Sequence, residues 1–180
     1  MRSPIHDFQA CRAVEDRWSA KLDDWLAESY PMRPATMDEQ WRGMDRLVRV
    51  ALDEDGIEVG VDYKCDERAA RTGNAFIETV SNDVSGRKGW ALTTEADWVF
   101  YFVVPDRVFG VLSTKLRAAI PDWQRRFPTR AARNLGRDGR PFQTLGVCVP
   151  LKEVAAVAEW VAHLDQGDGP VLALREEVME

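Results

Sequence analysis

Two aspartates and one lysine stand where the sequence predicts a β-hairpin. Residues 47–61 hold an apolar run, a turn signal and a second run with alternating apolar positions, a pattern typical of two antiparallel strands. Because strand side chains alternate between the two faces, Asp62 and Lys64 are expected on one face, while Asp45 opens the partner strand. The pattern therefore predicts a compact acidic pocket that contains one positive charge.

These residue types suit metal-assisted chemistry on phosphates. Carboxylate oxygens are ligands for hard divalent cations, and Mg²⁺ is typically held by one or two carboxylates, with waters and substrate phosphates as its other ligands. Asp45 and Asp62 could supply the carboxylates for Mg²⁺, or for Mn²⁺ in its place. Lys64 could orient an attacking water or neutralise charge on a phosphate in the transition state.

Each of these residues also has a purely structural interpretation. Asp45 could pair with Arg42 or Arg46 at the surface. Lys64 could pair with Asp62 or Asp66, in an ion pair that contributes little to stability. The functional interpretation is favoured for Asp62 and Lys64 because apolar neighbours are expected on the other face of their strand.

Two further acids are candidates for the same site. Glu78 falls in a predicted third strand at 75–80 and is expected near the hairpin pocket as a catalytic residue. Glu39 follows Thr36 by three residues, the spacing of a capping box at the start of a short helix, so both a structural role and a site role are open to it. Residues 72–74 favour a turn over a ligand role.

Six arginines concentrate positive charge in residues 125–140, where Asp138 is the single acid: Arg125, Arg126, Arg130, Arg133, Arg137 and Arg140. Such a segment could contact the phosphates of a nucleic acid. The alternative is a solvated loop that keeps the protein soluble. The net charge of −6 for the whole chain, taken alone, argues against nucleic-acid binding.

The remaining pattern predicts a single α/β or α+β domain over residues 1–180, with a central mixed sheet flanked by helices. A helix at about 114–120, which Pro121 interrupts or restarts, precedes the arginine-rich segment, which is expected to be a loop. The other expected elements are an N-terminal helix at about 6–29, a doubly covered strand at 97–104, strands at 108–112 and 143–149, and a C-terminal helix at about 151–166.

The sequence lacks the motifs and residues that several other classes of enzyme require. No P-loop, G-x-S-x-G or G-x-G-x-x-G motif is present. His6 and His163 are the only histidines, which leaves few groups for a catalytic triad or a zinc hydrolase. Cys11, Cys65 and Cys148 are far apart and odd in number. We therefore expect free thiols. Because the sequence also has no signal segment and no apolar span, we expect a cytoplasmic protein that does not bind a membrane.

The segment Gly43-Met44-Asp45-Arg46, followed by Asp62-Tyr63-Lys64 at the end of an apolar strand, resembles the active-site pattern of the PD-(D/E)XK nuclease superfamily. The resemblance covers roughly residues 40–104. It implies a restriction-endonuclease-like fold and Mg²⁺-dependent hydrolysis of phosphodiesters in DNA. In this chain Met44 stands where the pattern has proline, and Asp62 takes the place of the more common glutamate.

By this resemblance, Asp45 matches the first aspartate of the pattern, Asp62 its second acid and Lys64 its lysine. The backbone carbonyl of Tyr63 is a further implied metal ligand, and Glu39 matches the additional helical acid that some members contribute. We therefore predict a metal-dependent DNA nuclease. Cutting both strands of a duplex would suit a homodimer.

The alternative is a catalytically inactive nuclease-like domain, or an unrelated α/β domain, that binds a protein or nucleic-acid partner.

Overall fold

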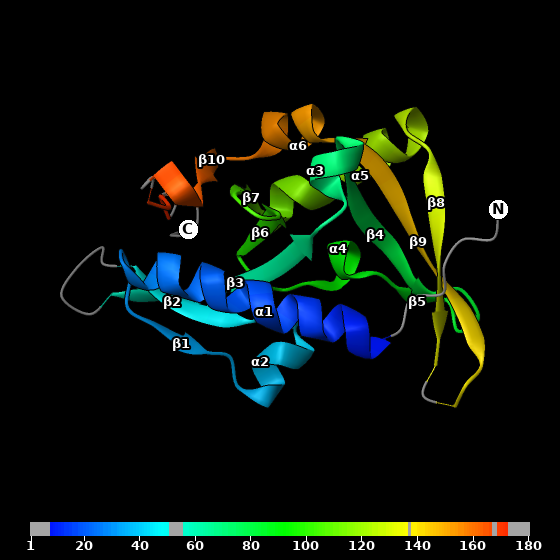
Figure 1. The fold of residues 1–180 in the computed structure, drawn as a ribbon, viewed down its shortest axis with the longest axis horizontal. Coiled ribbons are helices and arrows are strands. Elements are labelled where there is room, and N and C mark those ends of the chain that lie inside the picture. The colour runs from blue at the N-terminus through cyan, green and yellow to red at the C-terminus, as the bar shows by residue number, and fades with distance from the viewer. Residues whose placement is uncertain (1–7, 51–55, 137, 167–168, 173–180) are drawn as a thin grey trace, which may run out of the picture.

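A six-stranded mixed sheet carries the hairpin and its two aspartates in the computed structural model, which describes residues 8–50, 56–136, 138–166 and 169–172 (Figure 1). Strands β3 and β6 are parallel and every other pair in this sheet is antiparallel. The strands, in order across the sheet, are β1 (Met32–Pro34), β2 (Arg46–Val50), β3 (Ile57–Asp66), β6 (Trp98–Val103), β7 (Arg107–Leu112) and β10 (Trp160–His163).

Strands β2 and β3 form the predicted hairpin. Arg46 pairs with Val61 at one end and Val50 with Ile57 at the other. The turn was predicted at residues 53–56, of which 53–55 lie outside the described residues. Strand β6, expected to be covered on both faces, is buried along its whole length, which fits a strand between two packed layers. The predicted mixed sheet is therefore confirmed.

Helix α1 (Phe8–Ala27) covers one face of this sheet, close to the predicted bounds of 6–29. Leu22, Trp25 and Leu26 recur at helical spacing and are buried in a cluster to which β3 and β6 contribute, among others, Tyr63 and Phe100. Tyr63 lies on the face of β3 opposite Asp62 and Lys64, as alternation requires. One face of β3 is thus committed to the core beneath α1.

A second, four-stranded antiparallel sheet packs on the other side, so the expectation of one central sheet was incomplete. Parallel strands require a crossover, and the chain between β3 and β6 makes it through α3 (Ala69–Thr72), β4, β5 and α4 (Trp90–Thr93). The predicted third strand is β4 and belongs to this second sheet. Its strands, in order, are β5 (Arg87–Lys88), β4 (Asn74–Asn82), β9 (Pro141–Pro150) and β8 (Thr129–Leu135).

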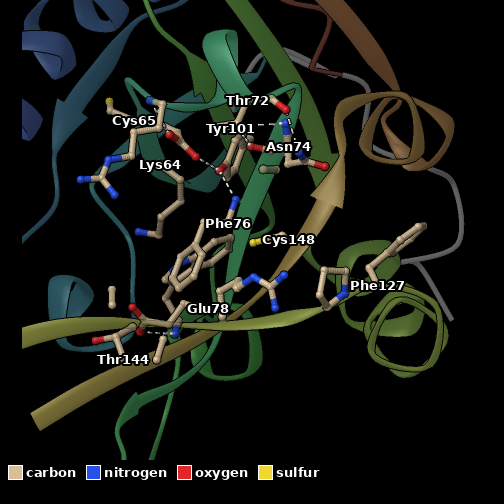
Figure 2. Close-up of a pocket in the computed structure, with 18 of the residues that line it drawn as sticks. Lys64, Cys65, Thr72, Asn74, Phe76, Glu78, Tyr101, Phe127, Thr144 and Cys148 are labelled. Carbon is tan, nitrogen blue, oxygen red and sulfur yellow. Dashed lines mark hydrogen bonds between the residues drawn. The ribbon is translucent and has the colours of Figure 1, made fainter. Parts of the chain in front are cut away.

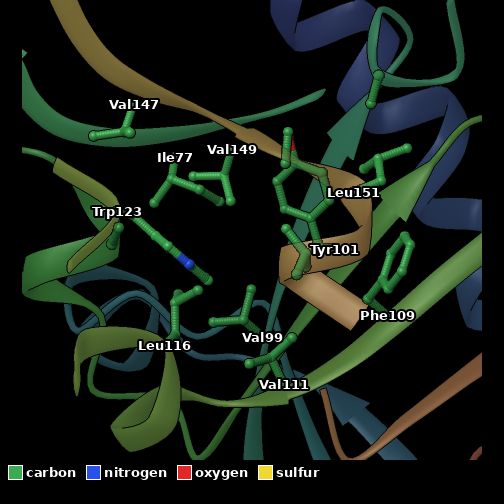
Figure 3. Close-up of a cluster of buried hydrophobic side chains, with 14 of the residues drawn as sticks. Ile77, Val99, Tyr101, Phe109, Val111, Leu116, Trp123, Val147, Val149 and Leu151 are labelled. Atoms are coloured by element: carbon green, nitrogen blue, oxygen red, sulfur yellow. The ribbon is translucent and has the colours of Figure 1, made fainter. Parts of the chain in front are cut away.

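The second core lies between the sheets and two helices, α5 (Ser113–Arg126) and α6 (Leu151–Val157) (Figure 3). Ile77 and Val147 of the four-stranded sheet pack in one cluster with Val99 of β6. Helix α5 was predicted to be broken at Pro121, but it continues through this residue. Buried side chains before and after it, Ile120 and Trp123, hold the two parts of the helix against the core.

The predicted C-terminal helix at 151–166 is wrong beyond Val157. Strand β10 follows and pairs with the edge of β7, and a short 3₁₀ helix (Leu164–Gln166) comes next. Trp160 occupies the space above Gly110, where an added Cβ would come within 2.0 Å of the indole ring. The apolar residues of this segment therefore serve sheet pairing and not a helix face. No helix in the described ranges is long and apolar enough to cross a membrane.

Candidate active site

The hairpin brings Asp45 to the strand that carries Asp62. Asp45 directly precedes β2, and its backbone N–H donates to the Val61 carbonyl at 2.8 Å. Its Oδ2 accepts a hydrogen bond of 2.7 Å from the backbone N–H of Tyr63, the residue after Asp62. The two carboxyl groups are close enough for the charge of Asp45 to raise the pKa of Asp62.

Asp62 is a buried carboxyl group with incomplete hydrogen bonding. It is 2% exposed, and the Lys64 ammonium donates to its Oδ1. Its Oδ2 is buried with no hydrogen-bond partner among the described residues. The nearby Thr94 hydroxyl donates to the Gly43 carbonyl. Burial raises the pKa of Asp62 to about 7 against the opposing attraction of Lys64.

Lys64 connects this buried acid to an open pocket. Its ammonium also donates to the Tyr63 carbonyl at 3.1 Å and lies 5.3 Å from the centre of the Trp90 ring. The Lys64 side chain is 21% exposed, whereas the Asp62 side chain is almost fully covered. Lys64 therefore links the Asp62 carboxyl, which does not line the pocket, to the pocket itself.

The structure tests the ion pairs that were the structural alternatives for Asp45 and Lys64. Arg46 forms two hydrogen bonds with Asp23, at 2.8 and 2.5 Å, and Arg42 pairs with Glu95 at 2.7 Å. Neither arginine forms a side-chain ion pair with Asp45, so that alternative is wrong. The Lys64–Asp62 ion pair does exist, but in a nearly buried setting where the cost of removing charges from water makes such pairs weak contributors to stability.

Glu39 is occupied by structural contacts. The predicted capping box is confirmed, since Thr36 and Glu39 exchange side-chain to backbone hydrogen bonds at the start of α2 (Met37–Trp41). Arg33 also donates to both carboxylate oxygens at 2.9 Å. These contacts lower the pKa of Glu39 to about 2, with the Arg33 hydrogen bonds the largest cause. The described contacts do not join Glu39 to Asp45 or Asp62.

Glu78 reaches the site from the other sheet. It lies on β4, and its Oε1 accepts a hydrogen bond of 3.4 Å from the backbone N–H of Trp90. Burial raises the pKa of Glu78, while the Trp90 N–H and the Lys64 charge oppose the shift. Glu78 and Lys64 line the same pocket, as predicted for an acid near the hairpin.

This pocket has a volume of about 880 Å³ and lies between β3 with α3 and the strands of the four-stranded sheet (Figure 2). In Figure 2, Lys64, Phe76 and Glu78 lie on one side of the pocket, and Phe127 lies on the other. Four basic and two acidic side chains line it, with four aromatic rings: Lys64, Arg68, Arg130, Arg133, Asp66, Glu78, Phe76, Trp90, Tyr101 and Phe127. Its walls thus combine positive charge with aromatic surface.

The predicted arginine-rich loop is instead the end of a helix and part of a hairpin. Arg125 and Arg126 are on the last turn of α5 and form ion pairs with Asp122 at 3.1 and 2.9 Å. Arg126 also pairs with Glu153 on α6 at 3.1 Å. These two arginines do not line the pocket.

The other arginines of the segment separate into two groups. Arg130 and Arg133 are exposed on β8 and line the pocket. Arg140 precedes β9 and lies 3.6 Å from Asp138. Arg137 lies outside the described residues. Since regular structure distributes the charge over separate surfaces, only part of the segment faces the candidate site.

The donors near Asp62 are compatible with a magnesium ion but form a small set. The described residues contain no group of three or more His, Cys, Asp or Glu side chains that could hold a metal. Two carboxylates and a carbonyl are nevertheless the kind of partial set that Mg²⁺ uses with waters and substrate oxygens. The unpartnered Oδ2 of Asp62 is a free donor atom for it.

No protein-family model, curated protein or solved structure is significantly similar to the chain.

Sequence patterns did not identify several residues of the pocket. Phe76 shares a face of β4 with Glu78 by strand alternation, a signal that was present in the sequence. Tyr101 donates its hydroxyl to Asp66 at 2.6 Å and accepts from the Phe76 N–H at 2.9 Å. The hydrogen bond between Phe76 and Tyr101 joins the two sheets, and no local sequence pattern predicts it.

Proposed function

We propose that this protein is a metal-dependent nuclease that hydrolyses phosphodiester bonds in DNA. The observation that supports the proposal most is the buried Asp62 carboxyl, with one oxygen unpartnered and the other held by Lys64, beside Asp45 and behind a basic pocket. A buried carboxyl with a shifted pKa next to a pocket is a typical functional arrangement. The mixed sheet beneath α1 is compatible with the restriction-endonuclease-like fold, which is part of the same proposal.

In this proposal the metal ligands are Asp45, Asp62 and the Tyr63 carbonyl. A bound Mg²⁺ would supply positive charge to the scissile phosphate and lower the pKa of a coordinated water. The Tyr63 carbonyl and Oδ1 of Asp62 both accept hydrogen bonds from Lys64 in the described structure, so Lys64 is held directly beside the proposed ligands. From this position its ammonium would contact a phosphate oxygen of the substrate.

Two side chains of the protein, Lys64 and Glu78, have roles in the proposed hydrolysis. Water attacks phosphorus and gives up a proton, the bond to the leaving oxygen breaks, and the leaving oxygen takes up a proton from solvent water. The Lys64 ammonium stabilises the charge that develops on the phosphate oxygens. Glu78 is a further acid that lines the pocket with Lys64, and its raised pKa brings it closer to the range in which a carboxylate accepts the water's proton. Glu39 has no catalytic part in this proposal, because its oxygens are held by Arg33 and Thr36.

The test is cleavage of labelled DNA by purified protein with Mg²⁺, with Mn²⁺, and with a chelator. Wild type should cut only when a divalent ion is present, and Asp62→Asn should stay folded and lose cleavage. Absence of cleavage on single-stranded, duplex and branched DNA, with both ions, would refute the proposal. The domain would then be better regarded as a partner-binding module.

A further inference from the structure

One face of the four-stranded sheet is free of core contacts and faces the pocket. Glu78 on β4 pairs with Gly146 on β9, which in turn pairs with Arg130 on β8, so these three residues form one row across the sheet. Because side chains alternate, Phe76 shares this face, whereas Ile77 points into the core. The sheet therefore presents an acid, an aromatic ring and an arginine to the same space.

Gly146 determines where the Phe76 ring lies. A Cβ at Gly146 would fall 2.5 Å from the ring, so the absence of a side chain there lets the ring lie against the backbone of β9. This position is next to the row that contains Glu78 and Arg130. Phe76 thus forms a wall of the pocket and is supported by backbone from behind.

Arg130 and Arg133 are two of the four cations that line this pocket. Both are exposed, and within the described residues neither forms an ion pair with a carboxylate, in contrast to Arg125 and Arg126. Of the pocket's two acids, Asp66 is occupied by the Tyr101 hydroxyl and by backbone N–H groups. Positive charge is concentrated here although the chain carries a net charge of −6.

We propose that the pocket binds unpaired nucleotides, with Arg130 on a phosphate and a base stacked on Phe76, so that the substrate is a single-stranded segment. This inference rests on the proposed nuclease function and specifies its substrate. Proteins that bind single strands combine a positively charged groove with aromatic rings, because every base has a face that can stack.

The size of the pocket favours the same substrate. Its volume of about 880 Å³ is within the range of about 300–1,000 Å³ found for small-ligand sites. That is enough for a few nucleotides of one strand. A duplex presents two paired strands and a major groove of about 12 Å, so a pocket of this volume suits part of one strand better than a whole duplex. Lys64 lines this pocket, so a strand must enter it to meet the proposed catalytic group.

The experiment measures fluorescence anisotropy of a labelled 12-nucleotide oligothymidine and of a blunt duplex of equal length, in chelator so that no cleavage occurs. Wild type should bind the single strand more tightly than the duplex. Phe76→Leu, which keeps an apolar side chain but removes the ring, should weaken single-strand binding about tenfold. Arg130→Ala should weaken it and reduce the slope of log K against log salt by about 0.7, the value for one phosphate contact on a single strand.

Arg125→Ala is the matched control, because it removes the same charge from outside the pocket and should change neither quantity. The proposal is overturned if duplex binds more tightly, or if Phe76→Leu and Arg130→Ala behave like Arg125→Ala. It is also overturned if free thymidine monophosphate competes as well as the oligonucleotide, which would assign the pocket to a small molecule.

Asp62→Asn separates this inference from the proposed function. This variant should keep single-strand affinity while losing Mg²⁺-dependent cleavage. Cleavage of duplex that is insensitive to Phe76→Leu and Arg130→Ala would leave the nuclease function in place and refute the single-strand assignment. Tight single-strand binding without any cleavage would refute the nuclease and retain the binding site.

Discussion

Lys64 holds one oxygen of the buried Asp62 carboxyl and leaves the other without a hydrogen-bond partner among the described residues. A buried polar atom without a partner costs folding free energy, on the order of 1–3 kcal/mol, and more if the group is charged. A carboxyl group that served stability alone would not need this arrangement. In the proposed function, a bound metal completes the coordination of Asp62.

Asp62 should make the metal-free protein less stable as pH rises. Its folded-state pKa of about 7 lies above the ordinary value of 3.8, so the folded state binds this proton more tightly than the unfolded state does. The free energy of unfolding should therefore fall between about pH 4 and pH 7. Asp62→Asn lacks this component, so its stability relative to wild type should increase across that window. Urea denaturation at several pH values in chelator measures the difference, and parallel curves for the two proteins would contradict it.

Lys64→Ala should reduce the cleavage rate by about 10²–10³-fold, the usual effect of removing one group that stabilises transition-state charge. Binding of Mn²⁺ should persist, because Lys64 is not a proposed ligand. Lys88→Ala, on exposed β5, removes the same charge away from the pocket and serves as the control. Single-turnover cleavage of a labelled oligonucleotide measures the rate, and equal rates for the two variants would remove Lys64 from the mechanism.

Glu39→Gln should affect stability and not metal binding. The pKa of Glu39 is about 2, below its ordinary value of 4.5, so its stabilising effect is present at neutral pH and is lost as pH falls through this range. The variant should be less stable than wild type at pH 7, and the two should converge near pH 2. Thermal unfolding across this range checks the trend. Loss of Mn²⁺ affinity in Glu39→Gln would instead make Glu39 a metal ligand.

Gly146→Ala should displace the Phe76 ring. The added Cβ meets the ring at 2.5 Å, and overpacking of this kind typically costs about 1–3 kcal/mol. Affinity for the single strand should fall with it. Because Leu at position 76 makes room for the methyl group, the double variant with Phe76→Leu should lose less stability than the sum of the two single variants. Additive losses would show that Gly146 does not support the ring.

Local patterns predicted the elements whose contacts are local. The hairpin of β2 and β3, the Thr36–Glu39 capping box and the buried β6 each follow from spacing within a short segment. The assignment of 151–166 to one helix was wrong because Trp160 packs against Gly110, about 50 residues earlier in the chain. Such long-range packing overrides local periodicity.

In the candidate site, too, the local contacts were predicted from the sequence and the long-range contacts were not. Asp45, Asp62 and Lys64 could be placed together because one hairpin carries all three. The position of Lys64 beside Phe76 and Arg130 depends on how the second sheet closes over β3, through contacts such as that of the Phe76 N–H with the Tyr101 hydroxyl. Charge composition alone indicated the arginines, but only the strand β8 shows which of them line the pocket.

Binding of Mn²⁺, followed by electron paramagnetic resonance, tests the central claim most directly, because it requires neither substrate nor cleavage. Wild type should bind the ion at a site that Mg²⁺ competes for, and Asp45→Asn and Asp62→Asn should each abolish this binding while Glu39→Gln retains it. If the wild type binds no ion, or if both aspartate variants bind it as the wild type does, the two carboxylates are not a metal site and the proposed nuclease mechanism is wrong.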